Sequence, residues 1–103
     1  MTEARVVLCT APTAVADQIA HRLLERRLIA CANVLPGVRS HYRWKGKIET
    51  ESESLLILKT TAAKIDELFA EIASIHPYDV PEMLSLPVDA GSHAYLAWLT
   101  GAG

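Results

Sequence analysis

Cysteine is scarce in this sequence, and the two cysteines present do not form a motif. Cys9 and Cys31 stand alone in apolar segments, without the C-x-x-C pair of a redox or zinc site. A reducing compartment keeps isolated cysteines as thiols, so no disulfide framework is expected. Cys31 also lacks a histidine or carboxylate at ligand spacing, which favours a packing role for it.

Excess basic charge and long hydrophobic runs are missing as well. Ten lysines and arginines stand against twelve aspartates and glutamates, giving a formal net charge of −2 at pH 7. Without a basic stripe to meet a phosphate backbone, nucleic acid is not an expected partner. The apolar stretch after Arg5 is too short for a signal-peptide core or a bilayer span. We therefore expect a cytoplasmic protein without a membrane partner.

Sequence motifs of common enzymes are also lacking. The chain has no P-loop, no nucleophile elbow and no H-E-x-x-H pattern, and neither cysteine has a base close to it in the sequence. The sequence therefore predicts a protein without enzymatic activity.

What the chain does have is apolar residues, which make up 50% of its 103 residues. This length suits one core, so residues 1–103 are expected to form a single domain. Short apolar or β-branched runs predict strands within residues 5–10, 28–44, 54–59 and 83–88. Helical spacing of apolar residues predicts helices after Thr13, over residues 65–75 and after Ser92. Thr13 is the expected N-cap of the first helix.

The order of these elements predicts an α+β fold, a ferredoxin-like βαββαβ sandwich with a C-terminal helix. Pro36-Gly37 should break or bulge the second strand, and Lys45-Gly46 should form the turn of an extended hairpin from Val38 to Glu53. The strand near Pro87 is expected at an edge of the sheet.

Three predicted strands are apolar at consecutive positions, namely residues 6–9, 30–35 and 55–58. A sheet with one solvated face would alternate apolar and polar residues instead. Two helices can cover only one face, so the other face is expected to be covered by another subunit. The long hairpin, polar and aromatic in its distal half, would reach such a neighbour.

The segment IHPYDVPE, residues 75–82, is a candidate site. His76 follows the strongest predicted helix, where it could cap the carbonyl end or bind a metal ion. Pro77 and Pro81 stiffen the loop that carries Tyr78, Asp79 and Glu82. Stiffness suits either a binding site or a plain helix-to-strand connection. Cys9, in the first strand, is a core thiol or, as the less common alternative, a metal ligand.

Aromatic rings with a cation nearby form a second candidate region. This composition is typical of a subunit interface or of a small-ligand pocket. The residues are Tyr42, Trp44, Lys47, Tyr95 and Trp98.

Several segments together closely resemble the CutA divalent-cation tolerance proteins, in order and over nearly the whole chain. They are VVLCTAP (6–12), LIACANVLPGVRSHYRWKGKIE (28–49), LLILKT (55–60), HPYDVPE (76–82), LPV (86–88) and YLAWL (95–99). The resemblance implies a cytoplasmic, PII-like homotrimer of ferredoxin-like subunits joined by the long hairpin. It also implies binding of copper or other divalent cations, a role in metal tolerance, and no established catalytic activity.

The resemblance implies that Cys9 and His76 are copper ligands, in a weak site. Some relatives have a histidine doublet before the proline, and here Ile75 replaces the first histidine. Cu(I) accepts few ligands and favours sulfur. We expect the second helix to deliver His76 near the beginning of the first strand, about 15 Å from Cys9. On that interpretation, one ion could contact both residues only if they came from different subunits.

The alternative function is a PII-like signalling module. Its inter-subunit cleft would hold a small anionic ligand or a partner protein. The residues expected to line this cleft are Tyr42, Trp44, Lys47, Lys59, Tyr78, Glu82 and Trp98.

Overall fold

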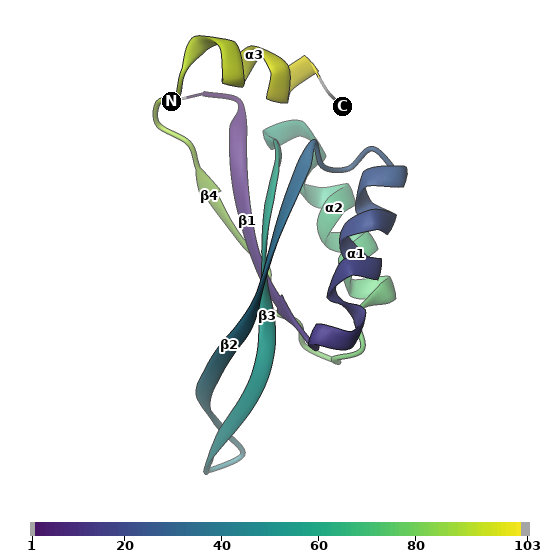
Figure 1. The fold of residues 1–103 in the computed structure, drawn as a ribbon, viewed down its shortest axis with the longest axis vertical. Coiled ribbons are helices and arrows are strands. Elements are labelled where there is room, and N and C mark those ends of the chain that lie inside the picture. Colours follow the sequence, from purple (N-terminus) through teal and green to yellow (C-terminus); the bar gives the residue numbers. More distant parts are fainter. Residues whose placement is uncertain (1, 102–103) are drawn as a thin grey trace.

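A computed structural model describes residues 2–101 of the chain, which form a four-stranded antiparallel sheet and three α-helices (Figure 1). The strands lie in the order β2-β3-β1-β4. Their bounds are β1 (Ala4–Ala11), β2 (Cys31–Trp44), β3 (Lys47–Thr61) and β4 (Leu84–Pro87). The short strand β4 contains Pro87 and lies at an edge, as the sequence predicts.

The helices are α1 (Thr13–Glu25), α2 (Ile65–Ile75) and α3 (His93–Gly101), with a short 3-10 turn, Ala62–Lys64, before α2. Helices α1 and α2 cover one face of the sheet, and α3 lies across one end of it (Figure 1). This arrangement confirms the predicted ferredoxin-like α+β fold with a C-terminal helix. No helix within residues 2–101 is long and apolar enough to cross a membrane.

The core lies between the sheet and helices α1 and α2. Alternate residues of β3, such as Leu56 and Leu58, are completely buried, and so are Leu68 of α2 and Leu23 of α1. Period-two alternation in the strand and one apolar stripe on each helix bring these side chains together. Thr13 is the first helical residue rather than the N-cap: Pro12 is the cap, and the Thr13 hydroxyl is hydrogen-bonded to Ser54 Oγ at 3.0 Å.

The opposite face of the sheet is apolar, and neither α1 nor α2 covers it. Leu8 and Ile57 are partners across β1 and β3 and are only half-buried. Leu84, which pairs with Leu8 from β4, is 56% exposed, and Leu35 of β2 is 43% exposed. The consecutive apolar residues of the sequence therefore supply both the core and this uncovered face.

Strands β2 and β3 continue past the body of the protein as a twisted hairpin (Figure 1). Lys45 and Gly46 form its turn with φ angles of 51° and 80°, the left-handed pair that a tight hairpin turn requires. The register shifts between Leu35 and Val38, where Pro36-Gly37 forms the predicted bulge. The hairpin is the main reason that the molecule measures 44 Å along its longest axis.

Candidate functional site

The direction of α2 decides where His76 lies. Strand β3 is antiparallel to β1, and α2 then turns back along the sheet in the same direction as β1. The carboxyl end of α2 therefore lies beside the carboxyl end of β1. His76, the C-cap residue of α2, is only 7% exposed at this end.

Cys9 and His76 meet at one backbone carbonyl within a single chain. His76 Nε2 is 2.8 Å from the oxygen of Thr10, and Cys9 Sγ is 3.7 Å from the same oxygen. The expected separation of about 15 Å is therefore wrong, and so is the inference that the two side chains can meet only across subunits. The error came from reversing α2, which runs with β1 and not against it.

Both ring nitrogens of His76 are occupied by protein partners. A carbonyl oxygen only accepts, so Nε2 carries the proton that it donates to Thr10. Nδ1 accepts a hydrogen bond from the backbone N–H of Tyr78 at 3.1 Å. These partners assign a neutral imidazole with the proton on Nε2, fixed between the end of β1 and the loop after α2.

The thiol of Cys9 is equally well enclosed. Its side chain is completely buried, and burial raises its pKa to about 12, with smaller contributions from the negative charges of Glu82 and Glu53. Cys9 is therefore a protonated thiol at neutral pH. A metal ion needs a thiolate and a free imidazole lone pair. In this structure the thiol is protonated and both ring nitrogens are hydrogen-bonded, so neither side chain is free to bind a metal ion.

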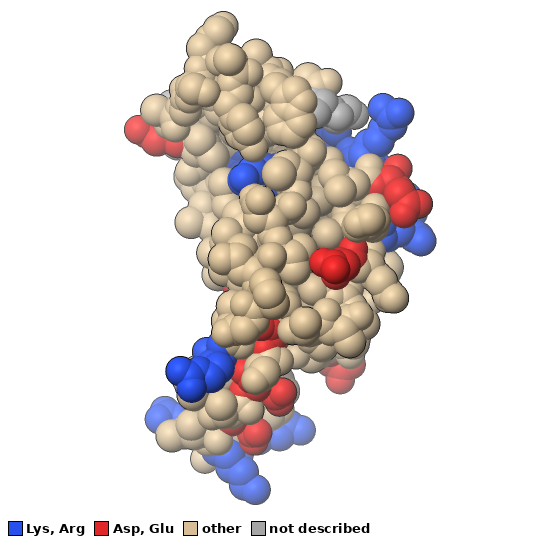
Figure 2. Space-filling view, viewed as in Figure 1, with Lys and Arg blue, Asp and Glu red and all other residues tan. Residues whose placement is uncertain are grey.

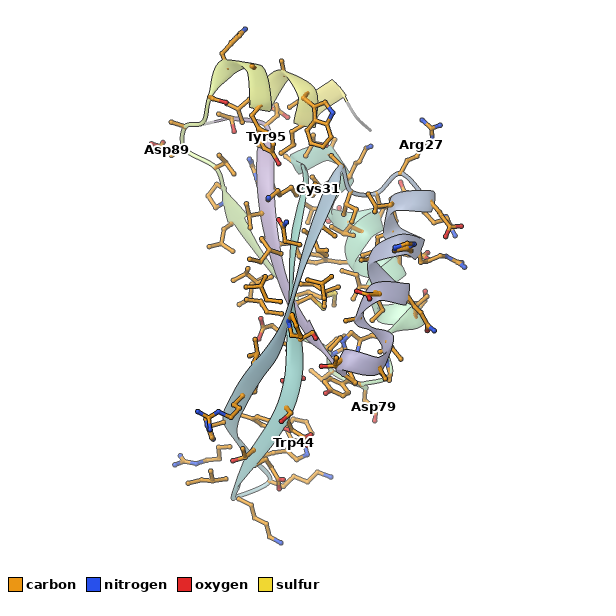
Figure 3. All side chains as sticks on the ribbon, viewed as in Figure 1. Arg27, Cys31, Trp44, Asp79, Asp89 and Tyr95 are labelled. Atoms are coloured by element: carbon orange, nitrogen blue, oxygen red, sulfur yellow. The ribbon has the colours of Figure 1, made fainter. Side chains whose placement is uncertain are left out.

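A pocket of about 580 Å³ lies beside this pair, between the hairpin and the loop after α2. Tyr42 and Trp44 line it from the hairpin, and Tyr78 lines it from the loop. Figure 3 labels Trp44 and Asp79 on the two sides of this hollow. The four carboxylates that line the pocket are Glu51, Glu53, Asp79 and Glu82.

Tyr78 joins the pocket to the Cys9–His76 pair. Its hydroxyl donates to Glu53 Oε2 at 2.8 Å, and its ring centre is 4.7 Å from that of His76. Burial, together with this hydrogen bond and the charge of Glu53, raises the pKa of Tyr78 well above its ordinary value. The phenol therefore keeps its proton and remains a donor to Glu53.

The structure gathers some of the predicted cleft residues and separates others. Tyr42, Trp44, Tyr78 and Glu82 line the pocket, whereas Lys47 does not and lies next to the hairpin turn. Two further predicted residues, Lys59 and Trp98, belong to a different region around α3. There Lys59 Nζ donates to Asn33 Oδ1 at 2.7 Å and lies 5.9 Å from the centre of the Tyr95 ring, which contacts Trp98.

Sequence reasoning missed Glu51 and Glu53 as pocket residues, whereas Asp79 lies in the candidate segment 75–82. A signal for the two glutamates was present in the pattern E-T-E-S-E over residues 49–53, in which every second residue is acidic. In a strand, that spacing places the carboxylates on one face. Within residues 2–101, no group of three or more His, Cys, Asp or Glu side chains comes together as a metal cluster.

Fold and site together define a small ferredoxin-like α+β protein in which a buried cysteine and a buried histidine meet at one backbone carbonyl, beside an acidic, aromatic pocket. The sequence model described as "CutA1 divalent ion tolerance protein" matches residues 5–102. The chain belongs to this family, which confirms the resemblance seen in the sequence.

Two curated relatives are similar over nearly the full chain. The divalent-cation tolerance protein CutA of Pectobacterium atrosepticum is 45% identical, over 99% of this chain and 94% of its own. The CutA protein of Citrobacter koseri is 48% identical, over 97% of this chain and 88% of its own.

Solved structures agree with this assignment. The divalent cation tolerance protein of Thermus thermophilus has a TM-score of 0.93 and 43% identity, covering 96% of this chain and 97% of its own. The PII-like protein CutA of Nostoc sp. in its apo form has a TM-score of 0.90 and 33% identity, covering 95% of each chain. The fold is therefore shared with CutA1 and PII-like proteins.

Proposed function

We propose that this chain is a cytoplasmic, homotrimeric protein of the divalent-cation response that binds copper weakly, with Cys9 and His76 as ligands. The observation that supports this role is the convergence of Cys9 Sγ and His76 Nε2 on the Thr10 carbonyl. A thiolate and an imidazole suit Cu(I), which accepts two ligands and favours sulfur. Residues 1–103 act as one domain in this proposal, and the role is binding rather than catalysis.

Copper binding would require changes on both side chains. Cys9 would lose its proton, and His76 would have to give up the proton that Nε2 donates to Thr10. A neutral ring would then carry its proton on Nδ1, facing the N–H of Tyr78. Two donors cannot share a hydrogen bond, so the loop that carries Tyr78 would have to shift. These costs are consistent with a weak site.

The homotrimer is supported by the uncovered apolar face and by the projecting hairpin. Leu84, Leu86 and Leu35 expose 56%, 43% and 43% of their surface, and Trp98 of α3 exposes 51%. Soluble monomers rarely leave so many large apolar side chains together on one face. Neighbouring copies of the chain would remove this surface from water.

A Cu(I) titration against a competing chelator tests the copper site. We expect Cys9→Ser to abolish binding and His76→Ala to weaken it, because each variant removes one of two ligands. His21→Ala is the matched control, since His21 is exposed on α1 and takes no part in the hydrogen bonds of Cys9 and His76, and it should bind as the wild type does. Identical binding curves for the wild type, Cys9→Ser and His76→Ala would remove both residues from the role.

A second candidate function is a PII-like module that binds a small ligand or a partner protein at clefts between subunits. The pocket of about 580 Å³ favours it, since this volume is typical of small-molecule sites. An anionic ligand would need Lys47 and Lys59 from a neighbouring subunit, because neither residue lines the pocket within one chain.

A further inference from the structure

We propose that the pocket between the hairpin and the loop after α2 binds a small organic cation, namely an aliphatic amine with more than one ammonium group. The pocket contains a surplus of negative charge, a nearly buried carboxylate without a cation, and aromatic rings that attract ammonium groups. The inference does not depend on copper binding, because Cys9 and His76 do not line the pocket.

Charge is the first argument. Four carboxylates line the pocket, and no lysine or arginine does. The ion pairs of residues 2–101 join Arg22 and Arg26 to Glu71, so within one chain none of the pocket carboxylates is neutralised by an ion pair. Figure 2 shows acidic side chains gathered where the hairpin leaves the body of the protein, with lysine and arginine side chains beside them and further along the hairpin. Such a hollow attracts cations and repels anions.

Glu53 supplies the second and independent argument. Its side chain is 5% exposed, and its one hydrogen bond among the described residues is to the hydroxyl of Tyr78, through Oε2. Within residues 2–101, no side-chain oxygen or nitrogen is both sealed from solvent and without a hydrogen bond. Oε1 of Glu53 has no hydrogen-bond partner among the described residues and is therefore not sealed from solvent, and Glu53 is one of the residues that line the pocket. A nearly buried carboxylate without a cation is unfavourable, and a ligand ammonium group would pair with it.

Aromatic rings determine which kind of cation fits. Tyr42, Trp44 and Tyr78 line the same hollow as the carboxylates, and ring faces attract ammonium groups within about 6 Å. A divalent metal ion instead needs several ligands at one point, and the described residues offer no such cluster. A volume of about 580 Å³ also suits a chain-like molecule better than a single ion.

Titration of the full-length, assembled protein with spermidine, a linear triamine, tests the proposal in the absence of copper. Calorimetry should show one saturable site per chain. In a Trp98→Phe background Trp44 is the only tryptophan, and its fluorescence should change with the same Kd. Citrate, the anionic probe, should produce neither signal. Binding of citrate in place of spermidine, or no binding of spermidine, would overturn the proposal.

Matched variants locate the site. Glu53→Gln keeps the shape of the side chain but removes its charge, and Asp79→Asn does the same on the loop. Each should weaken spermidine binding about tenfold or more, the usual effect of losing a charged hydrogen-bond partner. Glu67→Gln is the control, because Glu67 is exposed on α2 and outside the pocket. Equal affinity in all four proteins, or equal weakening by Glu67→Gln, would show that spermidine binds only non-specifically.

Discussion

At the scale of single residues, the Cys9 thiol and the His76 imidazole meet at the carbonyl oxygen of Thr10. The imidazole is held neutral by one donor and one acceptor, and the thiol is held protonated by burial. Both side chains therefore stabilise the fold, and metal binding would require each of them to lose a proton or a hydrogen bond. The pair ties the end of β1 to the loop that carries Tyr78.

The raised pKa of Cys9 predicts that alkali destabilises the protein. The pKa is about 12 in the folded chain against 9.0 for an ordinary cysteine, so above pH 9 the unfolded state releases this proton while the folded state keeps it. The stabilising effect is fully present below pH 9 and is lost as the pH rises toward 12. The slope contributed by Cys9 should approach about 1.4 kcal/mol per pH unit.

Urea unfolding at pH 8, 9 and 10 measures this slope. Cys9→Ala should show a weaker pH dependence than the wild type, whatever its stability at pH 8. Cys31→Ala serves as the control, since Cys31 is only half-buried, and it should keep the wild-type slope. A Cys9→Ala protein with an unchanged slope would contradict the assignment.

At the scale of elements, the hairpin turn shows how two residues determine the path of two long strands. Lys45 and Gly46 both have positive φ angles, a conformation that favours Asn-Gly over Lys-Gly. A Cβ atom at position 46 would meet nothing within 4 Å, so any cost of adding one comes from the backbone alone. The turn is therefore a place where backbone strain can be measured without a change in packing.

Substitutions at this turn should act in opposite directions. Gly46→Ala should lower the free energy of unfolding by about 1 kcal/mol, because alanine resists the left-handed conformation. Lys45→Asn should raise it by a few tenths of a kcal/mol, since asparagine accepts positive φ more easily. Thermal unfolding of both variants checks the prediction. A Gly46→Ala protein as stable as the wild type would show that the turn relaxes.

Most elements could be predicted from the sequence because each has a strong local signal. The apolar spacing of residues 65–75 predicts α2 within its observed bounds, and Pro36-Gly37 marks the bulge. The direction of α2 relative to β1 depends on strand pairing, which is not local, and this prediction was wrong. The burial of Glu53 was missed for a similar reason, since its hydrogen-bond partner Tyr78 is 25 residues away in the sequence.

At the scale of the whole molecule, one face of the sheet carries the helices and the other carries exposed leucines. An assembly of copies should bury this second face. A charged side chain introduced on it should therefore weaken the association of the chains. Leu84 is suited to a test because it is 56% exposed in one chain, and its replacement should disturb the chain's own core little.

We expect Leu84→Glu to dissociate the assembly. Light scattering should give the wild type a mass three times the 11.3 kDa of one chain, and the variant a mass near that of one chain. Leu24→Glu is the control, because Leu24 is 40% exposed on α1, a helix of the covered face. A wild-type mass of one chain at micromolar concentration would contradict the trimer.

Tyr78 links the two proposed sites, because its backbone N–H donates a hydrogen bond to His76 and its hydroxyl donates one to Glu53. Thermodynamic reciprocity then constrains both proposed sites. If copper displaces this tyrosine and changes the amine affinity by some factor, the amine must change the copper affinity by the same factor. One phenol ring would thus make two unrelated ligands heterotropic effectors of each other.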